Sequence, residues 1–539
     1  MTVSMLAAAV IVDELCALGV QEAVVCPGSR SAPLAYALHA ADAEGRLRLH
    51  VRVDERTAAF LALGLAKATG QPVAVVTTSG TAAGNLLPAL MEAHHSGVPV
   101  IAVTADRPST LVGTGANQTA DQVGMFGGVP RAAARIVASE SAPDSWRSAL
   151  RRVVTSARGS RSGLPGPAHL NVELPDPLFG ELPAAPAGTP FSVESSPAPV
   201  AVGLPAGPRT VVVAGDLPPG EGRAVAAEAG RAGVPLLAEP SSNARGGTTA
   251  VTHYQLLLPL LDDEVERVVV VGHPTLSRPV SRLLSRRDVE IVAVAAGASW
   301  VDPGAAVSQV VGSVRLPVGD PSWLERWHRA DATLARLRLD AGSDGLSGRS
   351  LAAAVAASTG HVLVLGSSNP VRDADLAPAG RPWPDTYANR GLAGIDGTVS
   401  TAAGIALATG RPTTALMGDL TFLHDASGLV IPTGEPVPTL RIVVADDRGG
   451  SIFALLEHGS PERAGTFERV FATPPGVDVA EVARGYGVRV TEVSDHPALV
   501  AVLARPWSGI EVVVVRLDRA GRRADADRLR ALARRAAGL

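Results

Sequence analysis

Residues 61–80 read LALGLAKATGQPVAVVTTSG, and residues 401–420 read TAAGIALATGRPTTALMGDL. Each copy is an Ala/Leu-rich helical segment, a Gly/Pro turn and a short apolar strand that ends in small polar residues. We interpret the copies as the same unit in two domains of shared topology, with chance similarity between Ala/Gly-rich stretches as the alternative. At a constant offset of 340 (61 and 401) they share Gly64/Gly404, Ala66/Ala406, Ala68/Ala408, Thr69/Thr409, Gly70/Gly410 and Pro72/Pro412.

Strand-like runs of the same kind recur along the whole chain. Examples are PVAVVTT from Pro72, TVVVAGD from Thr210, RVVVVG from Arg267, HVLVLGS from His361 and IEVVVVRLD from Ile510. Runs that are apolar throughout are typical of parallel strands covered by helices on both faces. The sequence therefore predicts an α/β protein with three open, mainly parallel sheet domains, the first and third related.

Two segments break this alternation. Residues 183–208 are rich in Pro, Ala, Ser and Gly, a composition that disfavours a helix and is typical of an interdomain linker. Residues 339–350, LDAGSDGLSGRS, are predicted to form a second linker. The predicted domains are therefore residues 1–182, 209–338 and 351–539.

Composition excludes some classes of partner. Apolar residues make up 46% of the 539 residues and the net charge is −4, which gives no reason to expect nucleic acid or an anionic membrane as a partner. Lys67 is the only lysine among 48 basic residues. Any site for carboxylates is therefore expected to use planar, bidentate guanidinium groups.

The cellular compartment is predicted from the cysteines and the N-terminus. Cys16 and Cys26 are too few for a disulfide framework and fit a reducing cytosol. Asp13 and Glu14 interrupt the first apolar run, which favours an amphipathic helix over a signal peptide. No run reaches the roughly 18 apolar residues needed to cross a bilayer, so we expect a cytoplasmic protein.

Two acidic strand ends in the third part of the chain predict a metal site. LMGDLTFLHDASG places Asp419 at one strand end, and RIVVADDRGGSIF places Asp447 at a second, one helix and one strand later. Two carboxylates and the exposed carbonyls of Gly449 and Gly450 are oxygen ligands that suit Mg²⁺, with phosphate and water completing the shell. The glycines would also let the backbone approach a diphosphate. The alternative is that each Asp only caps a turn.

A further acid lies near the start of a predicted helix in the first domain. HVRVDERTAAFLALGLA places Asp54 and Glu55 between a short strand and an apolar helix. Such an acid usually serves as an N-cap, which the helix dipole favours. The functional alternative is a carboxylate that faces a cofactor at the mouth of the sheet.

Arginines follow several of the predicted strands. Arg30, Arg107, Arg372 and Arg390 each lie just past an apolar run, where a loop faces a ligand. Four such positions predict a substrate with several carboxylates, although the abundance of arginine raises the chance of coincidence. Polar residues accompany them in the same loops: Ser29, Asn117, Gln118 and Ser368.

With these motifs in view, the sequence resembles the thiamine-diphosphate-dependent enzymes, whose GD motif is followed about 27 residues later by a Gly-rich turn. Within that superfamily it resembles the synthases of menaquinone biosynthesis. The resemblance covers nearly all of the first and third domains and is thin in the middle one, where GHPTLSRPVSRLL is the only stretch placed. It is carried by CPGSRSAPL, VDERTAAFLALGLA, TSGTAAGNLLPA, TADRP, GANQT, NRGLAGIDGTVSTAAG and GDLTFLHDASGL.

The resemblance implies a pyrimidine-binding, a central and a diphosphate-binding domain, and it implies roles for single residues. Glu55 would hydrogen-bond the aminopyrimidine of thiamine diphosphate, and Ile395 would force its bent shape. Asp419, Asp447 and the Gly449 carbonyl would bind Mg²⁺ or Mn²⁺. The remaining cofactor contacts would be Ser79, Gly80, Gly418, Leu420, Gly450, Ile452 and Phe453.

Substrate contacts are implied in the same way. The contacts would be Ser29, Arg30, Arg107, Asn117, Gln118, Arg278, Ser368, Arg372, Arg390, Ile452 and Phe453, with Glu55, Gln118, Ser368, Arg372 and Arg390 serving catalysis. Where the family often has asparagines, this chain has Asp446, Asp447 and Arg448. We expect Asp446 to be structural, and Arg448 either offsets the extra charge or points to solvent.

The implied reaction is decarboxylation of 2-oxoglutarate and 1,4-addition of the resulting carbanion to isochorismate by a thiamine-diphosphate-dependent transferase. Each of these substrates carries two carboxylates, in agreement with the arginines. The resemblance also implies a homo-oligomer, a dimer at least and a tetramer as a further possibility, because a cofactor site forms between the first domain of one chain and the third of another.

Three alternatives stay open. One is another 2-oxoacid lyase or synthase such as acetohydroxyacid synthase, which binds FAD in the middle domain, although residues 211–312 hold no strong dinucleotide fingerprint. The second is a non-catalytic binding protein, which Glu55 argues against. The third is a nucleic-acid role for the C-terminal RRADADRLRALARRAAGL, where Leu529, Leu532, Ala533 and Ala536 instead favour a helix docked by its apolar face.

Overall fold

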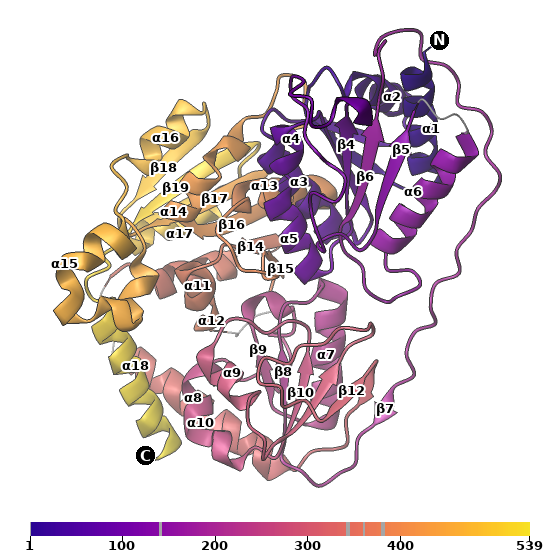
Figure 1. Ribbon diagram of the computed structural model, residues 1–539. Coiled ribbons are helices and arrows are strands. Elements are labelled where there is room, and N and C mark those ends of the chain that lie inside the picture. The colour runs from indigo at the N-terminus through magenta and orange to yellow at the C-terminus, as the bar shows by residue number, and fades with distance from the viewer. Residues whose placement is uncertain (1, 139–142, 341–344, 359, 361, 379–382) are drawn as a thin grey trace. The chain divides into compact units, whose positions relative to one another are not determined.

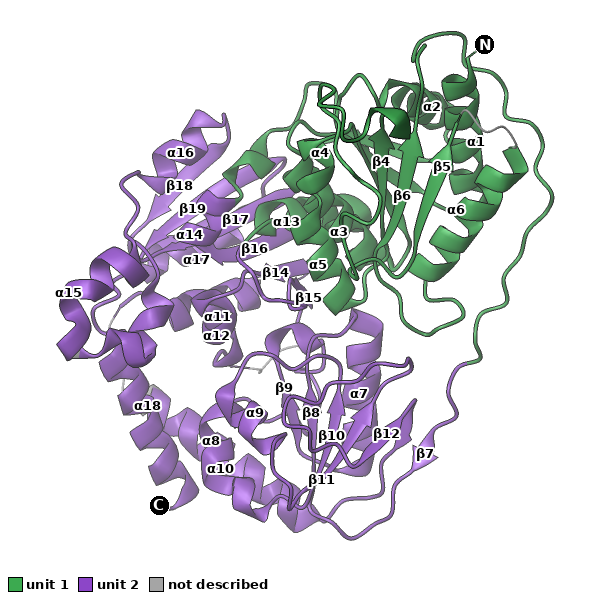
Figure 2. Ribbon diagram, viewed as in Figure 1, with its two compact units in different colours: residues 1–197, 396–410, 425–438 green, residues 198–395, 411–424, 439–539 purple. Residues whose placement is uncertain are grey.

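The computed structural model describes residues 2–138, 143–340, 345–358, 360, 362–378 and 383–539. They pack as two compact units, shown in Figure 2. Unit 1 comprises residues 1–197, 396–410 and 425–438, and unit 2 comprises residues 198–395, 411–424 and 439–539. These units divide the chain differently from the predicted domains, which remain a prediction.

Unit 1 is built on a parallel six-stranded sheet with the order β2-β1-β3-β4-β6-β5. Helices α1, α2 and α6 bury one face of this sheet, and α3 and α5 lie on the other (Figure 1). The strands are β1 (Glu22–Val25), β2 (Arg48–Val51), β3 (Val73–Thr77), β4 (Val100–Asp106), β5 (Ala133–Val137) and β6 (Ala168–Glu173). The helices are α1 (Val3–Ala17), α2 (Ala32–Ala43), α3 (Glu55–Thr69), α4 (Thr81–Gly84), α5 (Leu87–Ser96), α6 (Pro143–Ala157) and α13 (Thr398–Thr409).

Unit 2 contains the central sheet, also parallel, with the order β12-β11-β10-β8-β9. Alternate residues of one strand enter different cores: Val211 and Val213 pack on one face, and Val212 and Ala214 on the other. The strands are β8 (Thr210–Ala214), β9 (Leu236–Ala238), β10 (Arg267–Val271), β11 (Glu290–Val294) and β12 (Gln309–Val311). The helices are α7 (Pro219–Ala232), α8 (Tyr254–Leu261), α9 (Arg278–Leu283) and α10 (Pro321–Asp340).

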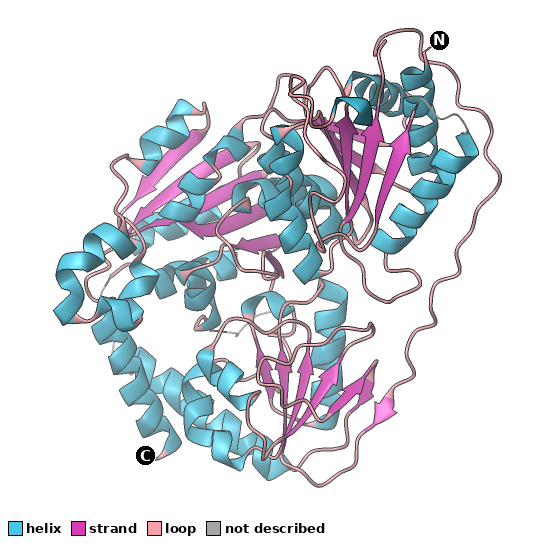
Figure 3. Ribbon diagram, viewed as in Figure 1, coloured by secondary structure: helices cyan, strands magenta, loops and turns pink. Residues whose placement is uncertain are grey.

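Unit 2 also contains a second parallel six-stranded sheet, with the order β15-β14-β16-β17-β19-β18. Figure 3 shows helices beside the strands of each large sheet. The strands are β14 (Val362–Leu365), β15 (Asp385–Ala388), β16 (Thr413–Gly418), β17 (Leu440–Asp446), β18 (Arg489–Val493) and β19 (Ile510–Arg516). The helices are α11 (Gly348–Ser358), α12 (Asn369–Asp375), α14 (Asp419–His424), α15 (Ala464–Phe467), α16 (Val479–Gly485), α17 (His496–Ala504) and α18 (Arg522–Ala537).

The two six-stranded sheets have the same topology. Numbered from the first strand of each sheet, both orders are 2-1-3-4-6-5. The repeated stretches occupy equivalent places, because β3 and β16 are the third strands and α3 and α13 precede them. Both helices also end at the equivalent glycines, Gly70 with φ 67° and Gly410 with φ 61°. The predicted α/β class and the related first and third sheets are confirmed, and chance similarity is not the origin of the repeat.

The two predicted linkers lie mostly outside helices and strands, with short regular elements at parts of each. Residues 183–201 contain neither helix nor strand, and β7 (Val202–Gly203) pairs with β13 (Val314–Arg315) inside the predicted first linker. In the second, α10 ends at Asp340, α11 begins at Gly348, and residues 341–344 lie outside the described residues. Among the described helices, none has both the length and the apolar character that crossing a membrane requires.

Candidate active site

Three adjacent strands of the β14–β19 sheet end in polar residues at one edge. β14, β16 and β17 are parallel neighbours, so their carboxyl ends meet. Asn369 begins α12 after β14, Asp419 begins α14 directly after β16, and Asp447 follows the last residue of β17. The two aspartates predicted from the sequence to lie near each other are therefore at neighbouring strand ends.

Hydrogen bonds tie both aspartates to residues 446–451, which we call the acidic turn. The Gly449 N–H donates to Oδ2 of Asp419 at 2.7 Å, and the Leu420 N–H donates to its Oδ1 at 2.8 Å. The Ser451 hydroxyl donates to Asp447, and Asn369 Nδ2 donates to Ser451 Oγ at 2.6 Å. Donors from the turn and from α14 therefore orient Asp419, and Ser451, which accepts a hydrogen bond from Asn369 of α12, orients Asp447.

The charge of this pair suits a cation. Burial, followed by the charge of Asp447, raises the pKa of Asp419 to about 7. Burial also raises the pKa of Asp447, although Arg522 Nε lies 3.7 Å from its Oδ2. Two buried carboxylates, one of which disfavours ionisation of the other, are a set of hard oxygen donors that Mg²⁺ or Mn²⁺ would stabilise. The residues present therefore fit a divalent cation.

Asp446 and Arg448 have different places in the acidic turn. Asp446 is buried, forms an ion pair with Arg516, and accepts the Arg448 N–H at 3.2 Å. Arg448 has φ 57°, in the left-handed region that favours Gly and Asn, and its side chain is exposed. Asp446 thus supports the turn, as expected, and Arg448 points to solvent.

The glycines of the acidic turn are packed against backbone. A Cβ on Gly449 would lie 2.2 Å from the Ala472 carbonyl oxygen, and one on Gly450 would lie 2.5 Å from that of Phe471. Gly449 also has φ 129°, and the Gly450 N–H donates to the Ala472 carbonyl at 2.7 Å. The turn therefore needs both glycines for its own packing, whatever it binds. Their proposed contact with a diphosphate stays a prediction.

The residues after the turn form a short aromatic cluster. Ile452 and Phe453 belong to a 3₁₀ helix (Ser451–Leu455). The Phe453 ring lies 5.8 Å from that of Phe471, which stacks on His458 at 4.4 Å. This places Phe453 beside the acidic turn, where it is available to line a site.

Two of the predicted arginines lie together in unit 2. Arg390 is buried and donates to Oγ1 of Thr275 at 2.7 and 3.1 Å. Burial, followed by the charge of Arg390, lowers the pKa of Arg372, whose Nη1 donates to the Ser368 carbonyl at 3.0 Å. Ser368 has φ 78°. A buried and a half-buried guanidinium group that repel each other are suited to binding a carboxylate between them.

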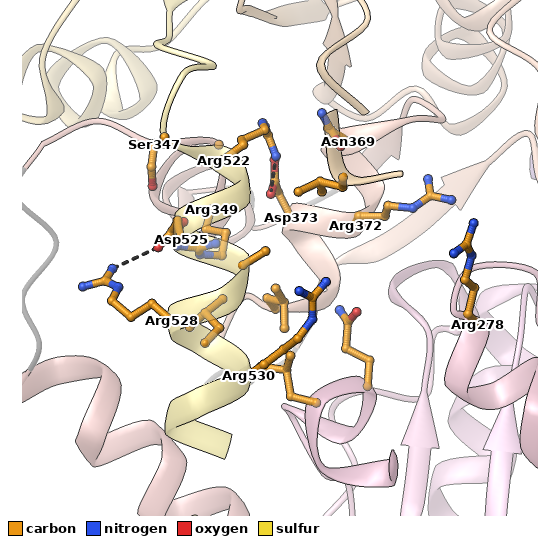
Figure 4. Close-up of a pocket in the computed structure, with 18 of the residues that line it drawn as sticks. Arg278, Ser347, Arg349, Asn369, Arg372, Asp373, Arg522, Asp525, Arg528 and Arg530 are labelled. Carbon is orange, nitrogen blue, oxygen red and sulfur yellow. Dashed lines mark hydrogen bonds and ion pairs between the residues drawn. The ribbon is translucent and has the colours of Figure 1, made fainter. Parts of the chain in front are cut away.

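Arg278 and Arg372 line one cavity of unit 2, of about 780 Å³, together with Asn369 (Figure 4). Arg278 forms an exposed ion pair with Glu457 at 3.1 Å. Ile395 lies half-buried in the loop between β15 and α13. The structure thus brings Arg278 to the same cavity as Arg372, and the role of Ile395 remains a prediction.

In unit 1 the helix cap and the candidate acid are separate residues. Asp54 caps α3, accepting the N–H groups of Arg56 and Thr57 at 2.9 and 3.3 Å. It also accepts a hydrogen bond from the Ser427 hydroxyl at 2.9 Å. Glu55 is the first helical residue, half-buried near the Cys26 thiol, whose pKa burial and the Glu55 charge raise to about 12. Since Asp54 provides the cap, the Glu55 carboxylate is not needed for it.

Ser79 and Gly80 are joined to the loop that carries Gln118. The Ser79 hydroxyl donates to the Gln118 carbonyl and Gln118 Nε2 donates to the Ser79 carbonyl, both at 2.9 Å. Gln122 Oε1 accepts the Gly80 N–H at 2.8 Å. Gln118 has φ 54° and is exposed, so this loop holds an unusual backbone conformation at the end of β3.

The remaining predicted contacts of unit 1 differ in exposure. Ser29 and Asn117 are exposed, and Arg107 is half-buried after β4. Arg30 is buried, donates to the Leu174 carbonyl at 2.6 Å and lies 3.5 Å from Asp176. Part of the Arg30 guanidinium is therefore already used within the fold.

Sequence reasoning missed several residues that hold this site together. Asn369, Ser451 and Gln122 support Asp447 and Gly80, and no role was predicted for any of them from the sequence. Asn369 and Ser451 adjoin the predicted contacts Ser368 and Ile452, and Gln122 lies four residues after Gln118. The pairing of Asp373 with Arg522 carried no local signal, because the two residues are 149 positions apart in the sequence.

Known proteins resemble the chain over nearly its whole length. Residues 5–125 match the family model of the thiamine pyrophosphate enzyme N-terminal TPP binding domain. The chain is 51% identical to a 2-succinyl-5-enolpyruvyl-6-hydroxy-3-cyclohexene-1-carboxylate synthase of Kineococcus radiotolerans, over 94% of each chain. It is 48% identical to the synthase of that name from Paenarthrobacter aurescens, over 96% of this chain and 95% of that one. It is 46% identical to the synthase of that name from Renibacterium salmoninarum, over 98% of this chain and 97% of that one.

Proposed function

The chain belongs to the family of 2-succinyl-5-enolpyruvyl-6-hydroxy-3-cyclohexene-1-carboxylate synthases, and we propose that it catalyses the reaction of that name in menaquinone biosynthesis. The substrates would be 2-oxoglutarate and isochorismate, and the products the synthase product and CO₂. The observation that carries this proposal is the full-length similarity to synthases of one name. The N-terminal match supports thiamine diphosphate as the cofactor.

The acidic turn supports a metal site for the diphosphate end of that cofactor. Asp419, Asp447 and the Gly449 carbonyl would hold Mg²⁺ or Mn²⁺, whose charge would offset both the carboxylates and the diphosphate. The buried position and raised pKa of Asp419 support this assignment. When bound, thiamine diphosphate supplies the electron sink for decarboxylation.

Glu55 is proposed to hydrogen-bond the aminopyrimidine ring. Its place at the first position of α3, with the cap provided by Asp54, supports a carboxylate free for a ligand. The rest of the cofactor contacts are proposed as predicted from the sequence, with Ser79 and Gly80 near the pyrimidine and Gly418, Leu420, Gly450, Ile452 and Phe453 near the diphosphate and thiazolium.

The arginines are proposed to orient the substrate carboxylates. Arg372 and Arg390, at the end of the sheet that bears Asp447, would form bidentate pairs with one of them. Their mutual repulsion would be relieved by an anion, so the pair is suited to a dicarboxylate. Four residues of the first domain are proposed to contact the substrate bound at the third domain of a partner chain. They are Arg30, Arg107, Asn117 and Gln118.

A homodimer is proposed as the smallest active assembly, and the pyrimidine-binding, central and diphosphate-binding domains keep their predicted bounds. Light scattering combined with an activity assay tests the assembly. An active monomer would contradict it.

The function is tested by direct turnover. Purified protein with thiamine diphosphate, Mg²⁺, 2-oxoglutarate and isochorismate should consume isochorismate and yield a product of the expected mass with release of CO₂. Pyruvate in place of 2-oxoglutarate is the control. Turnover of pyruvate alone would instead support an acetohydroxyacid synthase, and bound flavin would point the same way.

A further inference from the structure

The C-terminal helix α18 is anchored in the core of the central sheet. Leu529, Leu532 and Ala533 are buried in one cluster with Tyr254 of α8 and Trp327 of α10. Figure 1 shows α18 alongside α8 and α10. The apolar stripe seen in the sequence is therefore a docking face within the chain.

Arginines at the start of α18 reach the acidic turn and the 3₁₀ helix after it. Arg519, just before α18, donates through Nη1 to the Arg448 carbonyl at 3.0 Å. Arg523 donates to the Ala454 carbonyl at 3.1 Å and to the Leu456 carbonyl at 2.7 Å. The carbonyls of Arg448, Ala454 and Leu456 thus accept hydrogen bonds from two arginines at the start of α18.

Arg522 connects the same helix to the candidate metal ligand. Its Nη1 and Nη2 donate to Oδ1 and Oδ2 of Asp373 at 3.2 and 2.9 Å, and its Nε lies 3.7 Å from Oδ2 of Asp447. Figure 4 shows the two side chains paired at the wall of the cavity. A Cβ on Gly348 would lie 2.2 Å from Asp373 Oδ2 and 2.6 Å from Arg522 Nη2, so a side chain at this position would displace the pair.

Asp373 closes a ring of contacts back to the acidic turn. It lies on α12, which begins at Asn369, and Asn369 donates to Ser451, which donates to Asp447. Asp447 is therefore held from one side through α12 and from the other through Arg522. Arg522 of α18 takes part in the second route directly and meets the first one at Asp373 of α12.

We propose that Arg519, Arg522 and Arg523, which we call the α18 clamp, are positioning residues for the cation site, so that the central sheet acts on that site through α18. This inference rests on the proposed metal site and on no particular substrate. None of the three would touch the cation, because they contact Asp447 and the backbone of the acidic turn instead.

The charges argue for positioning over neutralisation. Arg522 is paired bidentately with Asp373, so the two together carry little net charge toward the site. Replacing Arg522 by Gln would leave the Asp373 charge without its partner, which by charge alone would favour a cation. Weaker metal binding in that variant would therefore report the lost positioning of Asp447. Outer contacts of this kind typically contribute 10–100-fold to metal affinity.

The test measures metal binding, not turnover, on the full-length protein with thiamine diphosphate. Mg²⁺ is titrated by calorimetry, and Mn²⁺ by its paramagnetic resonance signal. Arg522→Gln should weaken binding about tenfold or more, and Arg522→Lys, which keeps the charge without the fork, should also weaken it. Arg530→Gln is the matched control, because Arg530 lies on the same helix in an exposed ion pair with Asp527, and it should bind as the unsubstituted chain does.

Unchanged or tighter binding in a folded Arg522→Gln variant would overturn the proposal and leave Arg522 as a counter-charge only. Circular dichroism without metal establishes folding. If Arg522→Gln does not fold, Arg519→Gln decides. It removes the bond to the Arg448 carbonyl together with an exposed ion pair to Glu468, and normal metal affinity in this variant overturns the clamp. If the unsubstituted chain shows no metal-dependent cofactor binding, the proposed metal site fails instead.

Discussion

Gly64 and Gly404 face each other where α3 and α13 cross within unit 1. A Cβ on Gly64 would lie 2.2 Å from the Thr401 carbonyl oxygen, and one on Gly404 would lie 2.3 Å from the Leu61 carbonyl oxygen. The two contacts are equivalent, because 61 and 401 differ by the same 340 residues as 64 and 404. The internal repeat is thus also a self-complementary helix pair, in which each copy buries the same glycine against the other.

Substitution of Gly64 by Ala should destabilise unit 1. The added methyl group has backbone atoms of α13 as its neighbours, which cannot rotate away, so the helices must separate at a cost of about 1–3 kcal/mol. Denaturant unfolding measures the change. Gly84→Ala is the control: it lies in α4 with open space around its Cβ, and should be neutral or stabilising by up to about 1 kcal/mol.

Glu55→Gln should lose activity without losing stability. If the Glu55 carboxylate serves the cofactor, its neutral isostere should lower kcat by a factor of about 10²–10⁴, while thermal unfolding without cofactor stays unchanged. Asp54→Ala is the contrasting variant, expected to cost about 1 kcal/mol of stability by removing the cap of α3. Near-normal turnover of Glu55→Gln would remove Glu55 from the mechanism.

Arg448→Asn should stabilise the acidic turn. Asn adopts the left-handed conformation at φ 57° more readily than Arg, so we expect a gain of up to about 1 kcal/mol. Arg448→Ala removes the guanidinium but keeps the strain, and should gain nothing. Because the side chain is exposed, the Mg²⁺ dependence of activity should be the same in all three chains. A higher Mg²⁺ requirement in both variants would show that the charge matters.

His169 should make the stability of unit 1 depend on pH. Burial lowers its pKa from 6.5 to about 4, and its Nε2 lies 2.8 Å from the Thr104 hydroxyl. Between these pH values the unfolded chain takes up a proton that the folded chain does not, so stability falls as pH falls from 6.5 toward 4. Each pKa unit corresponds to about 1.4 kcal/mol.

Unfolding measured between pH 4 and 7 checks this dependence. His169→Gln should flatten the slope, while His39→Gln, at an exposed position, should not. A titration of His169 near its ordinary pKa in the folded protein would contradict the prediction.

Much of the architecture could be predicted from local patterns. Continuous apolar runs such as residues 210–214 identify parallel strands, because only helices on both faces of a sheet demand that every side chain be apolar. The proximity of Asp419 and Asp447 followed from the same reasoning, since neighbouring parallel strands end at one edge. The full-length relatives agree with the family that the motifs indicated.

Other features could not be foreseen. From the sequence, the glycines of the acidic turn were predicted to make room for a diphosphate. In the structure they lie against the carbonyls of Phe471 and Ala472. Asp54 and Glu55 are adjacent acids, and only the hydrogen bonds of α3 separate the cap from the free carboxylate. Arg522 and Asp373 are 149 residues apart and carry no local signal of their pairing.

Strand and helix patterns are local, because burial of one face selects residue types at a regular spacing within each element. The succession of strands and helices, and the acids at the strand ends, could therefore be predicted from the sequence. Contacts such as Gly64 with Gly404, or Arg522 with Asp373, depend on how finished elements pack in three dimensions. Close packing of backbone and the pairing of buried charges are set by that packing, and for them the folded arrangement was required.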